Sequence, residues 1–479
     1  MPQSLRWGLI WLSAWMILGG SQAQTSDAAQ QAEKAGEAMR AGHFEEAIRI
    51  YKGLSSTYPG DPALHLSLAT ALHSAGYYPE AMRQLELIRA HEKQNPKFWF
   101  LLGMTELKAG HAAEAVESLN RTLELEPDHD EARLELASTL LEMRRFTAAE
   151  KQYRSLARKL ATSPQVWQGL VLTQAGLSSE AFDALKKTAP HSSYLYGLAA
   201  VAASESGDTA NAVALYTKAL AASPAAEWMG RELTALQSGG SPARCSGNSY
   251  DCLFFNGEMQ KLAGEVSRLR TPEALYWTTR VYAQLAKQSM ETLTALPPSV
   301  EQHEVMARLY AQNGRKTEAI QELREAAKLS PENLPVAGEL AEALWADRQY
   351  DESLVLLRRL VEASPHRADW QFELGDALFN TGRPDEAVSH LKKAVEISPE
   401  FLPAHAKLGE ALLRTGDAAN AVPHLERAQS IDQDGSIHFQ LAAAYRKTGN
   451  VDAASKAIER QKELANAARE KMARSPWKQ

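Results

Sequence analysis

The stretch that decides the fold is PKFWFLLGMTELKAGHAAEAVESLNRTLELEPDH, which covers residues 96–129. Its apolar residues recur three to five positions apart, as they do along one face of an α-helix. They form two groups: Trp99, Leu102 and Leu107, then Ala115, Leu119 and Leu123. Gly110 separates the groups and suits the left-handed residue with which many helices end. The stretch therefore predicts two amphipathic helices joined by a short turn.

This pattern repeats along the chain every 34 residues. The turn position recurs at Gly42, Gly76, Gly110 and Arg144, and again at Gly314, Arg348, Gly382 and Gly416. A small residue follows five positions later, as Ala115 follows Gly110, and it lets the two helices approach closely. Prolines close many of the units, because proline cannot continue a helix: Pro59, Pro127, Pro224, Pro331, Pro365 and Pro399. A period of this length predicts a stack of helical hairpins.

The repeated residues resemble the tetratricopeptide repeat (TPR) family, whose consensus has Trp, Leu-Gly, Ala and Pro at fixed positions. The best matches are Trp99, Leu102, Gly103, Ala115 and Pro127, then Leu374, Gly375, Ala387, Ala394 and Pro399, and then Leu408, Gly409, Ala421 and Ala428. The resemblance covers nearly the whole chain after its first residues. It implies an all-α fold, an α-solenoid of helix-turn-helix units in one or two right-handed superhelical arrays. It also implies a scaffold that binds peptides or protein segments on its concave faces.

The repeats divide the chain into an N-terminal array over 24–226 and a C-terminal array over 271–468, followed by a basic tail over 469–479. Residues 227–270 carry no repeat signature, so we expect an irregular linker or insertion there. Two units depart from the pattern. The unit between Pro164 and Pro190 is expected to have a shortened turn near Gly176, and residues 271–299 are expected to form a degenerate helical hairpin at best.

Residues 1–23 are typical of a secretory signal peptide. Arg6 precedes an apolar stretch from Trp7 to Leu18, and small residues follow it as far as Ala23, where we expect cleavage. An apolar stretch of about 12 residues is too short to span a bilayer, so an uncleaved anchor is the weaker alternative. We therefore expect an exported, soluble protein, periplasmic or extracellular, with no membrane span after cleavage of the signal.

The chain has two cysteines, Cys245 and Cys252. In an exported protein, two neighbouring cysteines favour a disulfide. A redox-active pair is less consistent with the sequence, because the spacing is not Cys-x-x-Cys. Two free thiols are the remaining alternative.

Acidic and aromatic residues alternate at the positions that the resemblance assigns to the inner face of the C-terminal array. They are Glu339, Glu342, Trp345, Asp369, Phe372, Glu373, Asp376, Phe379 and Glu410. Such a groove would attract a basic segment that carries apolar anchors. The alternative is that the carboxylates are solvated helix surface and the aromatic rings pack between units. The corresponding residues of the N-terminal array are mostly apolar, which fits either a groove for an amphipathic helix or core packing.

The composition argues against several functional classes. With 52 Lys and Arg against 59 Asp and Glu, the chain lacks the basic excess that nucleic-acid binding would need. The sequence contains no phosphate-binding loop, zinc-protease motif, hydrolase serine motif or dinucleotide fingerprint, so we expect no catalytic residue, cofactor or metal. Two further hypotheses remain: an accessory component of envelope assembly or polysaccharide export, and an enzyme whose site lies in residues 227–270.

Overall fold

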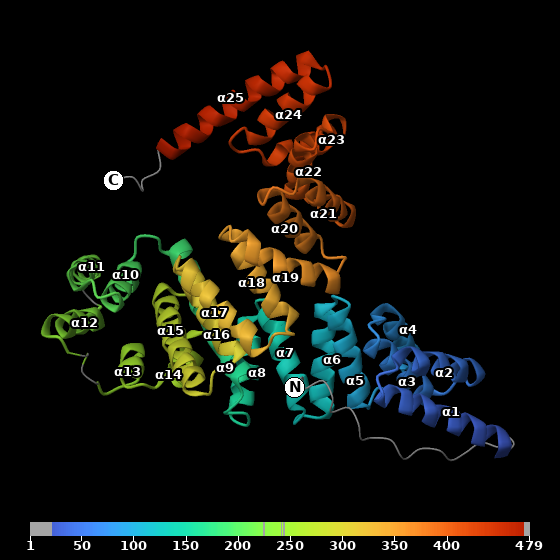
Figure 1. Cartoon of the computed structure of the whole chain (residues 1–479). Coiled ribbons are helices and arrows are strands. Elements are labelled where there is room, and N and C mark those ends of the chain that lie inside the picture. The colour runs from blue at the N-terminus through green and yellow to red at the C-terminus, as the bar shows by residue number, and fades with distance from the viewer. Residues whose placement is uncertain (1–21, 224–225, 241, 243–244, 474–479) are drawn as a thin grey trace. The chain divides into compact units, whose positions relative to one another are not determined.

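The computed structural model describes residues 22–223, 226–240, 242 and 245–473. The predicted signal peptide therefore lies almost wholly outside the described residues. The described part of the chain is built of helices and their connections, without strands, and forms two compact units, Met1–Leu296 and Pro297–Gln479. Most helices pair with the next helix along the chain, and the hairpins stack into an α-solenoid as the sequence predicts (Figure 1). In unit 1 the long helices α9 (Pro164–Thr188) and α15 (Pro272–Ala295) pair with each other instead.

Unit 1 contains fifteen described helices. They are α1 (Gln22–Arg40), α2 (Phe44–Thr57), α3 (Pro62–Ser74), α4 (Tyr78–Ile88), α5 (Pro96–Lys108), α6 (Ala112–Leu125), α7 (Asp130–Glu142), α8 (Phe146–Ala157), α9 (Pro164–Thr188), α10 (Ser193–Glu205), α11 (Thr209–Ala222), α12 (Glu227–Ser238), α13 (Tyr250–Phe255), α14 (Met259–Val266) and α15 (Pro272–Ala295).

Unit 2 contains the remaining described helices, which pair in order from α16 with α17 to α24 with α25. They are α16 (Val300–Gln312), α17 (Lys316–Leu329), α18 (Leu334–Ala346), α19 (Tyr350–Ala363), α20 (Ala368–Asn380), α21 (Pro384–Ile397), α22 (Leu402–Arg414), α23 (Ala418–Ala428), the 3₁₀ turn η1 (Gln429–Ile431), α24 (Ser436–Lys447) and α25 (Val451–Ala473). The predicted basic tail thus begins inside α25, and its last residues lie outside the described part.

The turn between the two helices of a unit adopts the left-handed conformation that the sequence pattern predicts. Gly110 has φ 84° and Gly382 has φ 81°. Two arginines occupy the same turn position with left-handed backbone, Arg144 (φ 57°) and Arg348 (φ 61°). A side chain with a Cβ is strained there, whereas glycine is not.

The small residues inside the hairpins allow close packing of the two helices. A Cβ added at Gly375 in α20 would lie 2.6 Å from Cγ of Leu391 in α21, and 3.3 Å from the carbonyl oxygen of Ala387. Gly103 has the same relation to Leu119, at 3.0 Å. These positions require glycine because of helix proximity, and not because of backbone conformation.

The prediction of a turn near Gly176 is wrong, because α9 is one continuous helix from Pro164 to Thr188. Gly176 serves close packing instead: a Cβ there would lie 2.5 Å from Cε1 of Phe146. The expected degenerate hairpin at 271–299 is also a single helix, α15. The two long helices run antiparallel against each other. Ser289 donates to Gln174 at 2.8 Å, and Ser178 donates to the carbonyl of Thr279 at 2.8 Å.

Residues 227–270 are not an irregular linker, because most of their described part is helical and packs into the core of unit 1. Met229 of α12, Leu253 of α13 and Leu262 of α14 are fully buried in the same cluster as Tyr276 and Trp277 of α15. This packing also explains the boundary between the units. The segment 271–296 belongs with the unit before it, and unit 2 begins at Pro297 and not at residue 271.

Candidate functional site

The first helices of the hairpins in unit 2 form its inner side. Neighbouring first helices, α18 with α20 and α20 with α22, contact one another as well as their own second helices. In a stack of hairpins, the helices that approach each other across units lie on the shorter, concave side. We use "inner strip" for the nine residues Glu339, Glu342, Trp345, Asp369, Phe372, Glu373, Asp376, Phe379 and Glu410, which come from α18, α20 and α22.

Several residues of the inner strip contact one another across units. Nε1 of Trp345 donates to Oδ2 of Asp376 at 2.8 Å, which links α18 to α20. Nζ of Lys407 in α22 lies 3.1 Å from Oδ1 of Asp376 and 2.8 Å from Oε2 of Glu410. These two bonds hold the pKa of Lys407 above its usual range although burial lowers it. Asp376 and Glu410 therefore share one lysine, which offsets one of their two negative charges.

The aromatic residues of the inner strip differ in exposure. Trp345 and Phe372 are half-buried, and their ring centroids lie 5.9 Å apart in an edge-to-face arrangement. The ring of Phe372 also packs edge-to-face against Phe401, at 5.0 Å. Phe379 is buried, with Nζ of Lys407 5.1 Å from its ring centroid. Phe379 is therefore part of the packing, whereas Trp345 and Phe372 keep exposed edges.

The carboxylates of the inner strip fall into two classes. Asp369 binds the guanidinium of Arg367, with Nε 3.0 Å from Oδ1, and this hydrogen bond lowers its pKa. Asp369, Asp376 and Glu410 thus have basic partners. Among the described residues no ion pair holds the other three acids, Glu339, Glu342 and Glu373. Glu339 and Glu342 are exposed.

Glu373 differs from its neighbours because its carboxylate is buried. Only 8% of the residue is exposed, and Oε2 has no hydrogen-bond partner. Burial, with the charges of Glu342 and Asp369 nearby, raises its pKa to about 8. A buried acceptor without a partner costs free energy, so it points either to strain or to a ligand group that is absent here.

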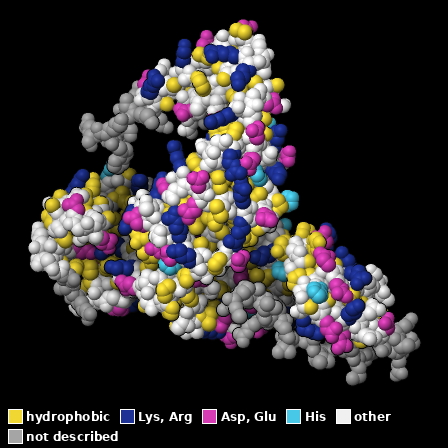
Figure 2. Space-filling model, in the orientation of Figure 1, with side chains coloured by type: hydrophobic (Ala, Val, Ile, Leu, Met, Phe, Trp, Pro, Cys, Tyr) yellow, Lys and Arg dark blue, Asp and Glu magenta, His cyan; other side chains and the backbone are white. Residues whose placement is uncertain are grey.

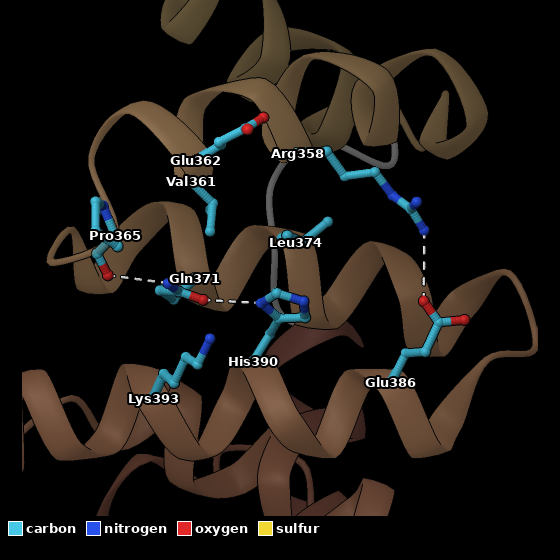
Figure 3. Close-up of a pocket in the computed structure, with 9 residues that line it drawn as sticks. All are labelled: Arg358, Val361, Glu362, Pro365, Gln371, Leu374, Glu386, His390 and Lys393. Atoms are coloured by element: carbon cyan, nitrogen blue, oxygen red, sulfur yellow. Dashed lines mark hydrogen bonds and ion pairs between the residues drawn. The ribbon is translucent and has the colours of Figure 1, made fainter.

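The outer side of the hairpins carries a second feature, a hollow of about 380 Å³ lined by residues of α19, α20 and α21 (Figure 3). Gln371 lies at its floor, where Nε2 donates to the carbonyl of Pro365 at 2.9 Å and Oε1 lies 2.9 Å from Nδ1 of His390. Arg358 and Glu386 pair across its rim at 3.4 Å. Its charged groups therefore include both signs.

The hydrogen bond of Gln371 belongs to a series that sequence reasoning missed. The fourth residue of a unit donates to the carbonyl six residues earlier, at the end of the preceding unit. The pairs are His65 with Pro59, Trp99 with Lys93, Arg133 with Pro127, Trp167 with Ala161, Gln371 with Pro365 and His405 with Pro399. We call these bonds the inter-unit struts. The 34-residue spacing of the donors was the available signal, but their residue types differ.

The two cysteines are joined in the structure, with 5.3 Å between their Cα atoms. Asp251 lies beside them, so the three residues have metal-ligand spacing within the described part of the chain. Both sulfurs are in the disulfide, however, and Asp251 pairs with Arg231. This cluster is therefore a local cross-link between the α12–α13 connection and α13.

The apolar inner positions of unit 1 contribute to packing. Phe100 is 2% exposed and lies in a core cluster with Leu136 and Tyr153, against which Met104 and Leu107 also pack. In the described residues no helix is both long and apolar enough to cross a membrane. On the face visible in Figure 2, acidic and basic side chains are interspersed with hydrophobic ones.

Comparison with known proteins places repeats in both units. Family models described as tetratricopeptide repeat match residues 38–104, 106–171 and 378–438, residues 339–400, and residues 193–225, 304–333 and 435–467. The helices α12 to α15 lie outside these ranges. Among curated proteins, none matches the chain.

Solved structures with local similarity include a protein named MamA. One crystal structure of MamA has 20% identity and a TM-score of 0.32, and the match covers 34% of this chain and 97% of that one. A second, MamA MSR-1, has 27% identity and a TM-score of 0.28, with coverage of 31% and 86%.

Proposed function

Because the chain belongs to the tetratricopeptide repeat family, whose members are protein-interaction scaffolds, we propose that it binds segments of other proteins along the inner strip of unit 2. The observation that supports this most is the buried, unpartnered carboxylate of Glu373 beside the exposed carboxylates of Glu339 and Glu342. The same two first helices, α18 and α20, carry the half-buried aromatic rings of Trp345 and Phe372.

The chemistry of the inner strip favours a basic segment with apolar anchors. Lys407 offsets part of the negative charge at the α22 end, whereas Glu339, Glu342 and Glu373 on α18 and α20 have no ion-pair partner among the described residues. The exposed edges of Trp345 and Phe372 supply apolar contact area beside that charge. Charged rims set the rate and specificity of association, while aromatic anchors supply much of the affinity.

Export through the predicted signal peptide is a second part of the proposal. The disulfide between Cys245 and Cys252 supports it, since disulfides persist in oxidising compartments and are rare in reducing ones. Fusion of residues 1–40 to a reporter enzyme that is active only after export is the direct test. We expect active reporter, and reporter retained inside the cell would contradict export.

The binding proposal is tested with a random twelve-residue peptide library selected on the purified chain. A photo-crosslinking residue is introduced in place of Glu339 or Glu342, and in a matched variant in place of Glu396, which is exposed on the second helix α21. Glu339 and Glu342 tolerate replacement because neither holds another side chain. Asp376 is unsuitable for this purpose, since it bonds both Trp345 and Lys407.

We expect the selected peptides to crosslink from positions 339 and 342 and not from position 396. Two outcomes would overturn the proposal: no peptide is enriched over a selection without protein, or the enriched peptides crosslink from position 396 alone. The second outcome would move the site to the outer side, where the hollow beside Gln371 lies.

A further inference from the structure

Glu373 is a buried residue of the inner strip, and one oxygen of its carboxylate has no hydrogen-bond partner. It occupies the sixth position of the unit that begins at Ala368, on the inner side of α20. With 8% of the residue exposed, its carboxylate is shielded from most of the solvent that would otherwise hydrate it. Oε2 has no hydrogen-bond donor within the described residues.

The basic side chains of the inner side that could pair with Glu373 have other partners. Arg367 pairs with Asp369, and its guanidinium lies 4.4 Å from the ring centroid of Trp370. Lys407 bridges Asp376 and Glu410. Each of these cations already has the carboxylate that compensates it, so neither neutralises Glu373 without breaking an existing pair.

We propose that Glu373 is the anchor for a lysine or arginine side chain of the bound segment; this rests on the function proposed above and identifies the ligand group that the inner strip selects. The exposed carboxylate of Glu342 lies on the preceding first helix and adds attraction for the same cation. The half-buried rings of Trp345 in α18 and Phe372 in α20 lie 5.9 Å apart and would supply apolar contact area for the aliphatic stem of the entering side chain.

A cation suits the carboxylate of Glu373 better than the other groups that could bond its free oxygen. A neutral hydroxyl or amide would not offset the negative charges of Glu342 and Asp369, which oppose ionisation of Glu373. A metal ion needs several ligand atoms at short mutual distance, and in the described part of the chain only the cysteine cluster has that spacing. An ammonium or guanidinium supplies both the hydrogen bond and the charge.

Burial of the carboxylate couples binding to the loss of a proton. The charged groups that act on Glu373 are Glu342 from α18, Asp369 from α20 and Arg367, the residue just before α20. Lys407 from α22 is held by its own partners. Since its pKa is raised to about 8, Glu373 holds a proton at pH 7 in the free protein. A cationic ligand favours the charged form, so Glu373 gives up this proton to the buffer when the complex forms.

The test uses peptides selected on the full chain from the random library, and the variant Glu373→Gln. We expect each inner-strip peptide to contain a Lys or Arg whose replacement by norleucine weakens binding about 30-fold or more. Glu373→Gln should weaken the parent peptide by a similar factor and leave the norleucine peptide unchanged. The matched control is Glu396→Gln, another glutamate of unit 2, which should bind the parent peptide normally.

Calorimetric titration in two buffers of different ionisation enthalpy gives an independent readout. At pH 7 the wild-type chain should release close to one proton for each peptide bound, and Glu373→Gln should release none. Peptides that crosslink to the inner strip but lack an essential cation, or that bind Glu373→Gln normally, would overturn the anchor while leaving the scaffold proposal intact. Failure to select any peptide would instead contradict the scaffold proposal itself.

Discussion

At the scale of single residues, the turn between the helices of a unit shows how one position tolerates an unfavourable side chain. Arg348 and Gly382 occupy equivalent turns, and both have left-handed backbone. Arginine pays a steric cost there that glycine avoids. The arginine side chain is exposed and forms no bond that offsets this cost.

We therefore predict that Arg348→Gly raises the free energy of unfolding of unit 2 by about 1 kcal/mol. Urea denaturation followed by circular dichroism measures this change. The reciprocal control is Gly382→Ala, which should lower stability by a similar amount, because a Cβ at Gly382 meets no neighbouring atom and only its φ is unfavourable. Equal stability of Arg348→Gly and wild type would show that the turn is not strained.

Glu373 gives a second prediction at this scale, and its sign follows from the raised pKa. The ordinary pKa of the group is 4.5 and the folded value is about 8, so between these values the folded chain binds more protons than the unfolded chain. Stability from this group is therefore lost as pH rises from about 4.5 to 8. Glu373→Gln removes the titration, and at pH 8.5 it should be more stable than wild type by about 1–3 kcal/mol.

The measurement is urea denaturation of both proteins at pH 5 and pH 8.5. The difference between them should be small at pH 5, where the carboxyl is protonated in the folded chain. A wild-type protein that gains stability over this range relative to Glu373→Gln would contradict the assigned environment of the carboxylate.

The sequence pattern could place inner-strip residues on the first helices, because helical periodicity fixes the face. It could not distinguish Glu373 from Asp376. The two residues are three positions apart on α20. Asp376 accepts a hydrogen bond from Trp345 and pairs with Lys407, whereas Glu373 bonds to neither. Such pairings depend on contacts between units, which no periodicity within one unit describes.

At the scale of helices, the region that lacks repeat character is held together by one buried cluster. Glu232 of α12 pairs with Arg280 of α15, and the hydroxyl of Tyr216 in α11 donates to Oε2 of Glu232 at 2.6 Å. The guanidinium also lies 4.4 Å from the ring centroid of Phe254 in α13. The cluster thus joins four helices that belong to different hairpins.

We predict that Arg280→Met destabilises unit 1 by about 3–5 kcal/mol, because it leaves a buried carboxylate without its cation. The ring centroids of Trp228 and Trp277 lie 4.9 Å apart in the same core. Tryptophan fluorescence during urea denaturation therefore reports the loss of stability. The double variant Glu232→Gln with Arg280→Met should recover part of the stability. A double variant no better than Arg280→Met would mean that packing, and not charge, causes the effect.

Helix boundaries were predictable where a left-handed residue marks the turn and were mispredicted where glycine has another role. Gly176 resembles a turn in the sequence, but its partner is the ring of Phe146, and the helix continues through it. Gly257, with φ 83°, is a true turn between α13 and α14, in a segment expected to be irregular. The sequence alone does not separate a glycine needed for its φ from a glycine needed for close packing.

At the scale of the whole molecule, the chain has two compact units, and the disulfide belongs to unit 1. We predict two calorimetric transitions in the wild-type chain. Reduction of the disulfide should lower the midpoint temperature of only the unit 1 transition. The free energy of unfolding of unit 1 should fall by about 2–3 kcal/mol, the value expected for a short closed loop. Glu373→Gln should shift only the other transition. A single transition that responds to both changes would contradict independent units.

The number and type of repeats could be read from the sequence, but the boundary between units could not. Repeat phase suggested a break at residue 271, and the packing of Tyr276 and Trp277 against α12 and α13 moves it to residue 297. The boundary depends on the burial of large aromatic residues against helices from another part of the sequence. The repeat pattern within one unit does not predict such contacts.

The inter-unit struts have a consequence for how such a chain changes over generations. Each donor is paired with a main-chain oxygen, which every amino acid supplies. Imidazole, indole, guanidinium and amide groups all serve as the donor. A substitution at the carbonyl residue therefore requires no matching substitution at the donor. A gene segment encoding one hairpin can then be duplicated or lost, and the new neighbours still join correctly at the seam.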